Sequence, residues 1–193
     1  MNDRRQQILD TAAVLFAQRG FHGVSVNDIG AACGISGPAL YKHFRGKGEL
    51  LAASLTDISE TLLEEGAARA AEAGSPSEAL NALIDWHVDF ALDHPAFIVV
   101  QDREWANLDT AGRRDVRALQ LRYIDVWVDT VQTLRPELDG ITDRATARAA
   151  VQATFGLLNS TPHSARIKPP EMRKLLVSMA LRALGAPEGV PLD

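Results

Sequence analysis

Residues 36–44 read Ser-Gly-Pro-Ala-Leu-Tyr-Lys-His-Phe, and this stretch decides how the N-terminal part of the chain folds. Ser36 is a good helix N-cap, because its hydroxyl can accept a hydrogen bond from a backbone N–H of the first turn. Pro38 falls in that first turn, where its missing N–H costs nothing. Leu40 and Phe44 are four residues apart and therefore share one helix face. The stretch predicts a short helix over 37–44 with one apolar and one polar face.

Two further helices are predicted upstream of this stretch. Residues 3–19 carry apolar side chains at three- and four-residue spacing, and Gly20 is a good C-terminal stop. Ser25, with Asp28 three residues later, is close to a capping box and begins a helix over 26–33. Gly34 ends that helix, so a short turn containing glycine leads into 37–44. The apolar residues expected to join these helices are Phe16, Ile29, Ile35, Leu40 and Phe44.

Two helices joined by such a turn form a helix-turn-helix. In this motif the second helix lies in the major groove of DNA, which is wide enough to admit one α-helix. Lys42 is the main candidate for reading guanine, because lysine can donate to the O6 and N7 acceptors. Shape and contacts with thymine methyl groups are expected to share the reading. The residues short or polar enough to approach base edges are Gly37, Pro38, Ala39, Lys42 and His43.

A dense set of residues carries a family resemblance over 5–52, about a quarter of the chain. Its segments are Ile8–Phe16, Gly20–Phe21, Val26–Ile29 and Gly34–Ser36, followed by Leu40–Phe44 and Lys47. In this pattern the region resembles the N-terminal domain of the TetR family of bacterial transcriptional repressors. Gly30 stands where the family usually has alanine, and it is expected to loosen the second helix slightly.

The resemblance implies a role for each matching position. Tyr41 would place its hydroxyl on a phosphate, and Lys47, at the start of the fourth helix, would contact another. Ser25 and Ser36 would contact phosphates from the starts of their helices. The residues implied to face the groove are Gly37, Pro38, Ala39, Lys42 and His43. The alternatives are a half-buried core position for Tyr41 and simple packing or capping for His43.

Composition and charge fit a packed protein with a DNA-binding head. The chain has 193 residues, 46% of them hydrophobic and 23% charged, which is typical of a globular protein. Its net charge is −5, but residues 1–50 hold six bases and four acids, and the remainder holds 14 bases and 21 acids. A net +2 head on a net −7 body is consistent with DNA binding by the head.

The same composition limits the compartment and the cofactors. Cys33 is the only cysteine, so an intrachain disulfide and a CxxC metal site are excluded, and we expect Cys33 to be a small buried residue. No cofactor or metal is expected. Neither a signal-peptide pattern nor a run of eighteen apolar residues occurs. We therefore expect a soluble cytoplasmic protein with no membrane partner.

Helical patterns continue to the C-terminal end, so the predicted fold class is all-α. Domain 1–48 is the predicted helix-turn-helix domain, and domain 49–193 is the predicted helical domain for effector binding and dimerisation. Residues 161–170 are expected to form an irregular connection. The helices predicted after residue 46 cover 47–73, 77–92, 95–108, 110–134, 142–159 and 171–184.

Aromatic and polar residues gather on the middle helices of the larger domain. Such a set can form an apolar pocket with a few polar groups, the usual form of a ligand site, and its alternative is the aromatic core of a helical bundle. The predicted effector-binding residues are Trp86, His87, Phe90, Phe97, Gln101, Trp105, Arg122, Tyr123 and Trp127. We expect a hydrophobic effector with an acidic group, such as a fatty acid or acyl-thioester. Arg122, His87 or His163 would meet the acid.

The last two predicted helices carry small or apolar faces. Small residues allow helices to approach closely, so we expect a homodimer, which also suits two heads on a palindromic operator. Packing within one subunit is the alternative. The residues of these faces are Ala149, Ala150, Ala153, Gly156 and Leu157, with Leu175, Leu176, Met179 and Leu184.

The predicted function is a ligand-responsive repressor that binds double-stranded operator DNA and is released by a small molecule. An enzyme is the main alternative, but the chain contains no HExxH, GxSxG or glycine-rich phosphate loop. A helical adaptor for other proteins is a second alternative, although an adaptor would not need a basic recognition helix. Repression and activation are not distinguished by the sequence.

Overall fold

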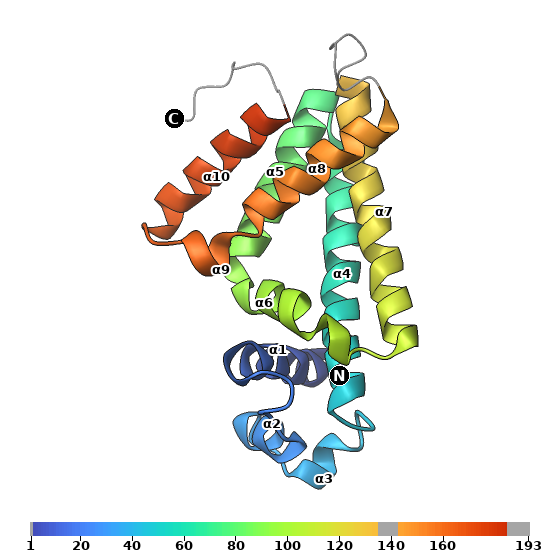
Figure 1. The fold of residues 1–193 in the computed structure, drawn as a ribbon, viewed down its shortest axis with the longest axis vertical. Helices are drawn as coiled ribbons and strands as arrows, with labels where there is room; N and C mark the ends of the chain where they lie inside the picture. Colours follow the sequence, from blue (N-terminus) through green and yellow to red (C-terminus); the bar gives the residue numbers. More distant parts are fainter. Residues whose placement is uncertain (1, 135–142, 185–193) are drawn as a thin grey trace. The chain divides into compact units, whose positions relative to one another are not determined.

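A computed structural model describes residues 2–134 and 143–184, and gives side-chain detail from residue 4 onward. All elements assigned within these ranges are helices, so the all-α fold class is confirmed (Figure 1). The elements are α1 (Asn2–Arg19), α2 (Val26–Ala32), α3 (Gly37–Leu40), α4 (Lys47–Glu72), α5 (Pro76–Asp93), α6 (Pro95–Glu104), the 3₁₀-helix η1 (Trp105–Asn107), α7 (Thr110–Leu134), α8 (Arg144–Leu158), α9 (Thr161–Ser164) and α10 (Pro169–Ala183).

Most predicted helix ends agree with the structure to within two residues. The helix expected over 95–108 is α-helical only to Glu104 and continues as η1, and two further predictions are wrong. The connection expected over 161–170 contains a short helix, α9. The helix expected over 37–44 is α-helical only to Leu40. Beyond Leu40, the N–H groups of Lys42 and His43 donate to carbonyls three residues back, at 3.2 and 2.9 Å, so the segment tightens into turns. The predicted start at residue 142 lies outside the described residues.

The chain divides into two compact units. Unit 1 comprises residues 1–60 and 96–119, and unit 2 comprises residues 61–95 and 120–193. The long helices α4 and α7 each contribute residues to both units. This division by packing differs from the functional boundary predicted after residue 48, which stays a prediction.

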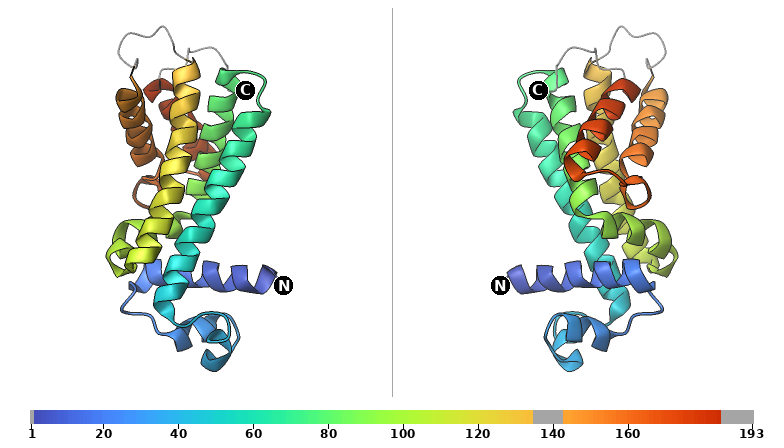
Figure 2. Two further views of the ribbon diagram at one scale, coloured as in Figure 1. Left: turned by 90° about the vertical axis from the view of Figure 1, so that its right-hand side faces the viewer. Right: turned by 90° about the vertical axis from the view of Figure 1, so that its left-hand side faces the viewer.

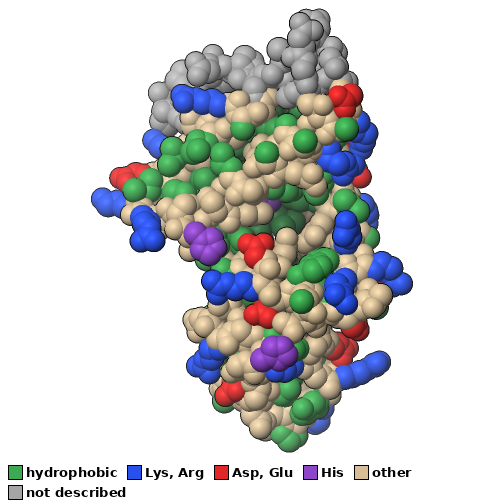
Figure 3. Space-filling view, viewed as in Figure 1, with side chains coloured by type: hydrophobic (Ala, Val, Ile, Leu, Met, Phe, Trp, Pro, Cys, Tyr) green, Lys and Arg blue, Asp and Glu red, His purple; other side chains and the backbone are tan. Residues whose placement is uncertain are grey.

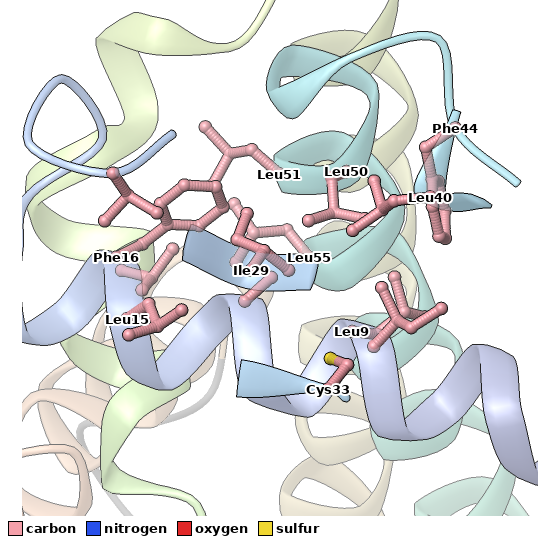
Figure 4. Close-up of a cluster of buried hydrophobic side chains, with 14 of the residues drawn as sticks. Leu9, Leu15, Phe16, Ile29, Cys33, Leu40, Phe44, Leu50, Leu51 and Leu55 are labelled. Atoms are coloured by element: carbon pink, nitrogen blue, oxygen red, sulfur yellow. The ribbon is translucent and has the colours of Figure 1, made fainter. Parts of the chain in front are cut away.

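Unit 1 is built around one apolar core. The side chains of α1, α2, α3 and the first turns of α4 point toward one another in Figure 4. Phe16, Ile29 and Leu40, which were expected to join the helices, are almost fully buried. Val100 of α6, Leu108 at the end of η1, and Val116 of α7 join the same cluster. Residues 96–119 therefore belong to the packing of the N-terminal unit.

Unit 2 is a bundle in which α10 packs against α5 and α8 (Figure 2). Arg173 of α10 donates to Asp89 at 2.7 Å and to Asp85 at 2.9 Å, which ties α10 to α5. Thr161 of α9 donates to the Ala91 carbonyl at 2.7 Å. Arg144 of α8 pairs with Asp125 of α7 at 2.7 Å. Polar contacts therefore fix the packing of an apolar bundle along its edges.

None of the helices described in this structure is both long and apolar enough to cross a membrane.

Candidate nucleic-acid interface and effector site

The capping box predicted at the start of α2 is present. The Asp28 N–H donates to the Ser25 hydroxyl oxygen at 3.1 Å, and the Ser25 N–H donates to the Asp28 carboxylate at 2.8 Å. The Ser25 hydroxyl also donates to Asp28 at 2.5 Å, and these hydrogen bonds hold the pKa of that carboxyl below its usual value. The box fixes the N-terminus of α2, the place from which Ser25 is predicted to contact a phosphate.

Two glycines shape the turn and the contact between α2 and α3. Gly34 has a φ of +68°, the left-handed conformation that glycine adopts without strain. Gly30 lies inside α2, and a Cβ there would come within 2.9 Å of the Ile35 carbonyl oxygen. The absence of a side chain at Gly30 thus permits a close approach between α2 and the backbone leading into α3.

The recognition segment, residues 36–44, presents two distinct faces. Ser36 caps it by accepting a hydrogen bond from the Ala39 N–H at 3.3 Å, as predicted. Leu40 is fully buried and Phe44 is 3% exposed, whereas Tyr41 is 56% exposed. Half-buried packing of Tyr41 in the core is therefore wrong. Pro38, Lys42 and His43 are also exposed, and Ala39 is partly buried.

Gly37 differs from the other predicted groove residues because it is buried. A Cβ at Gly37 would lie 2.0 Å from the side-chain oxygen of Asn27, the second residue of α2. Gly37 therefore packs against α2 in this structure, and a direct contact with a base stays a prediction. Asn27 itself is exposed beside the recognition segment, and the sequence analysis did not single it out.

Lys47, the first residue of α4, is engaged with the protein. Its ammonium donates to the backbone carbonyls of Phe21 at 2.8 Å and Val24 at 3.1 Å. It also lies 4.5 Å from the centroid of the Phe21 ring, in cation–π contact. A lysine ammonium has three N–H donors, so one is left for another partner. The phosphate contact predicted for Lys47 stays a prediction.

Two basic residues of unit 1 were not selected from the sequence. The Arg5 guanidinium lies 5.7 Å from the centroid of the Phe44 ring and pairs with Asp57 of α4 at 3.4 Å. No spacing in the sequence links residue 5 to residues 44 and 57. Arg45 is exposed directly after the recognition segment, and its position beside Phe44 was a usable signal. Both add positive charge to the unit that carries the recognition segment.

Four of the predicted effector residues come together in unit 2. His87, Phe90, Tyr123 and Trp127 are all buried, and the imidazole of His87 makes ring contacts with the other three. Phe155 of α8 and Asn159, the C-cap residue that follows α8, complete the cluster and were not selected from the sequence. The Phe155 ring stacks on His87 with centroids 4.6 Å apart, and the Asn159 side-chain oxygen lies 3.0 Å from Nε2 of His87.

Burial changes the acid–base chemistry of this aromatic cluster. It lowers the pKa of His87 to about 4, with the Asn159 hydrogen bond opposing the shift. Burial also raises the pKa of Tyr123 above its ordinary value. His87 is therefore a neutral imidazole at pH 7, with Nε2 facing Asn159 and Nδ1 3.4 Å from the Tyr123 hydroxyl. Both ring nitrogens already face partners, and the imidazole carries no positive charge.

The other predicted effector residues lie elsewhere. Trp86 belongs to unit 2, where its indole N–H donates to the Leu62 carbonyl at 3.3 Å and Arg69 lies over its ring. Arg122 is exposed on α7. Phe97, Gln101 and Trp105 belong to unit 1, and Trp105 packs against the core of that unit.

Cys33 is 4% exposed, so its prediction as a small buried residue is confirmed. A hollow of about 380 Å³ in unit 2 is lined by residues of α4, α5 and α7 that include Ala70 and Thr130, and by none of the predicted effector residues. Within the described ranges, no group of three or more His, Cys, Asp or Glu side chains is arranged to hold a metal ion.

Known proteins resemble the chain over both of its parts. The family described as bacterial regulatory proteins of the tetR family matches residues 8–54. The tetracyclin repressor-like C-terminal domain matches residues 73–184, more than half of the chain.

A curated relative is the HTH-type transcriptional repressor KstR2 of Mycolicibacterium smegmatis, 29% identical over 143 residues and covering 70% of each chain. Among solved structures, a TetR-family transcriptional regulator from Bordetella parapertussis is 25% identical, with a TM-score of 0.78 and coverage of 92% of this chain and 93% of that one. The transcriptional regulator FadR from Bacillus subtilis, solved in complex with stearoyl-CoA, is 16% identical with a TM-score of 0.73, over 92% of this chain and 98% of that one, and shares the fold.

The matches cover the helix-turn-helix with its buried Leu40 and exposed Tyr41, and they continue through the helical unit that holds the aromatic cluster. The chain belongs to the TetR family of bacterial DNA-binding transcriptional regulators.

Proposed function

We propose that this regulator is a repressor that binds a palindromic operator as a homodimer and is released by a small hydrophobic effector. The observation that carries the proposal is the two-faced recognition segment. Leu40 and Phe44 are buried in the core of unit 1, while Tyr41, Lys42 and His43 are exposed on the same short segment. A short segment of helix and turns held by its apolar face, with exposed polar side chains on the other face, is suited to the major groove.

The contacts divide into those that position the protein and those that read bases. Ser25, Ser36, Tyr41 and Lys47 are proposed to contact phosphates. Lys42 is proposed to read guanine, since its ammonium has the reach and the donors for O6 and N7. Pro38, Ala39 and His43 contribute shape and apolar contacts at the groove, with Gly37 allowing the backbone to approach.

A gel-shift experiment with DNA upstream of the protein's own gene tests this function. The wild type should retain the DNA, and Tyr41→Ala and Lys42→Ala should abolish or strongly weaken retention. Lys174→Ala, which changes an exposed lysine of α10 in unit 2, is the matched control and should bind like the wild type. The proposal would be contradicted if the wild type retained neither this DNA nor any other DNA at low salt.

A homodimer is supported by an exposed apolar surface on α10 and α8. Leu175 is 46% exposed and Met179 is 42% exposed on α10, and Figure 3 shows hydrophobic side chains gathered over this helix. Ala149, Ala153 and Gly156 of α8 are exposed as well. An exposed apolar face of this kind marks an interaction surface, and small residues allow a second copy to approach closely. Two copies would bring two recognition segments to a palindrome.

The proposed effector is a fatty acid or an acyl-thioester. The apolar rings around His87 suit an acyl chain, and stearoyl-CoA is bound by a protein of the same fold. The acidic group needs a different partner from His87, because that imidazole is neutral with a pKa of about 4. Arg122, or His163 on α9, is the proposed partner. The effector would favour one arrangement of the heads and the operator another, so binding at one site weakens binding at the other.

A further inference from the structure

The side chain of Lys47 joins two parts of unit 1 that are distant in the sequence. Lys47 begins α4 just beyond the recognition segment, after Arg45 and Gly46, whereas its two carbonyl partners, Phe21 and Val24, lie in the link between α1 and α2. The side chain is partly buried, and its ammonium rests on the ring of Phe21. Hydrogen bonds from a charged donor are stronger than those between neutral groups. The Lys47 side chain is therefore held against the link between α1 and α2 and does not extend freely into solvent.

The residues held by Lys47 lead directly to the N-cap of α2. Val24 is 1% exposed, and the next residue is Ser25, which forms the capping box with Asp28. At the other end of the link, the Phe21 ring packs against Phe16 of α1, with centroids 5.5 Å apart. Once Lys47 fixes the Val24 carbonyl, the place of Ser25 relative to the start of α4 is fixed as well.

We propose that Lys47 is a positioning residue for DNA binding, which clamps the link over 20–25 onto α4 and so sets Ser25 in register with Tyr41. This role rests on the proposed phosphate contacts of Ser25 and Tyr41 and goes beyond the phosphate contact expected of Lys47 itself. Two of the three ammonium donors serve the clamp. The third donor is free to bind a phosphate. Clamping the link and contacting a phosphate are therefore compatible, but they predict different experimental results.

A double-mutant cycle separates the two roles. Lys47→Met keeps most of the apolar stem on the Phe21 ring and removes the donors. If Lys47 acts through Ser25, the double variant with Ser25→Ala should bind operator about as weakly as the weaker single variant. If Lys47 acts only as an independent phosphate contact, the two fold-losses should multiply and the salt slope should fall by about 1. Multiplying losses would overturn the clamp.

Lys42→Met is the matched control, because Lys42 is an exposed lysine of the same unit on the recognition segment. Its fold-loss should multiply with that of Ser25→Ala. Lys47→Gln is a milder second variant that keeps N–H donors, and its coupling to Ser25→Ala should have the same sign. Thermal unfolding confirms that every variant compared is folded at the temperature of the binding measurement.

Amide hydrogen exchange tests the clamp without DNA. In the free protein, Lys47→Met should accelerate exchange of the N–H groups of residues 22–28 severalfold, while Lys42→Met should leave them unchanged. Equal exchange in the two variants would overturn the clamp even if the protein binds DNA as proposed. Accelerated exchange in a protein that binds no DNA would instead support the clamp and contradict the proposed function.

Discussion

At the scale of single residues, His87 is the group whose chemistry departs furthest from that in water. Burial among aromatic rings lowers its pKa to about 4, whereas a histidine in an unfolded chain has a pKa near its ordinary value of 6.5. Between these two values the unfolded chain binds a proton that the folded protein does not bind. The stability contributed by the neutral His87 is therefore present above pH 6.5 and is lost as the pH falls toward 4.

This difference in the pKa of His87 between the folded and unfolded states predicts a measurable pH dependence of the stability. Each pKa unit corresponds to about 1.4 kcal/mol, so the wild type should lose roughly 3 kcal/mol of unfolding free energy through His87 between pH 7 and pH 4. His87→Gln removes the titrating group, so its unfolding free energy should fall by roughly 3 kcal/mol less than that of the wild type between pH 7 and pH 4. Urea denaturation at a series of pH values measures the difference. His163→Gln, at an exposed histidine of α9, is the control and should follow the wild type. Parallel curves for wild type and His87→Gln would contradict the prediction.

At the scale of helices and their contacts, local signals predicted the elements well. Ser25, Ser36, Gly20 and Gly34 act on their own backbone neighbourhood, so the caps and stops could be predicted from the sequence alone. The helix predicted over 37–44 was too long, because the change from α-helix to tighter turns after Leu40 leaves the apolar spacing unchanged.

Contacts between distant segments could not be predicted in the same way. Phe155 of α8 and Asn159, which directly follows α8, join His87 across about 70 residues of sequence, and no periodicity relates them to His87. The Lys47 contacts could not be predicted either, because the ammonium binds the backbone carbonyls of Phe21 and Val24, and every residue has such a carbonyl. Most of the DNA-facing residues could be predicted because they lie close together in one short segment. The effector site could not, because it depends on how several helices pack.

The packing of α2 on α3 makes a prediction at the same scale. At an ordinary interior position of a helix, replacing glycine by alanine stabilises by up to about 1 kcal/mol. At Gly30 the new methyl group would lie 2.9 Å from the Ile35 carbonyl oxygen and 3.3 Å from the Gly37 nitrogen, so the backbone must shift. Overpacking of this kind costs about 1–3 kcal/mol, so Gly30→Ala should lower the unfolding free energy by about 1 kcal/mol.

Chemical denaturation measures this effect, with Gly48→Ala as the control. Gly48 lies in the first turn of α4, is exposed, and has open space around the position of a Cβ. Its replacement should leave the stability unchanged or raise it slightly. An equal gain from both substitutions would mean that α2 and α3 do not need the close approach.

At the scale of the whole molecule, packing and function divide the chain differently. The helix-turn-helix ends before α4, yet the compact unit that contains it also includes residues 96–119 from the middle of the chain. Patterns along the sequence could not reveal this, because the apolar residues of α6 and the start of α7 look like those of any buried helix. The packing gives α6 direct contact with the core that holds the recognition segment.

The apolar surface of α10 predicts the assembly state. Burying a large aliphatic side chain contributes about 1.5–3 kcal/mol, so charges at Leu175 and Met179 should raise the dimer dissociation constant at least about a hundredfold. Leu175→Glu combined with Met179→Glu should sediment as a monomer and bind a palindromic operator far more weakly than the wild type does. Lys174→Glu, at an exposed neighbour on α10, should remain dimeric. An unchanged sedimentation coefficient for the double variant would place the interface elsewhere.

The effector prediction is tested by thermal unfolding with ligands that share one chain length. A ligand at a hundred times its dissociation constant stabilises by about 2.7 kcal/mol, which raises the Tm of a protein of this size by several degrees. An acyl-CoA or the matching fatty acid should produce this shift, whereas an alkyl-trimethylammonium ion of equal length should not. Arg122→Gln should reduce the shift, because the acid would lose its cation, and Arg117→Gln, exposed on the same helix, should not. Stabilisation by the cationic ligand alone would contradict an acidic effector. Equal Tm shifts for Arg122→Gln and Arg117→Gln would mean that Arg122 is not the partner of the acid. The comparison of Arg122→Gln with Arg117→Gln is informative because His87 is neutral, so the aromatic cluster around it supplies apolar surface but no charge to compensate the acid.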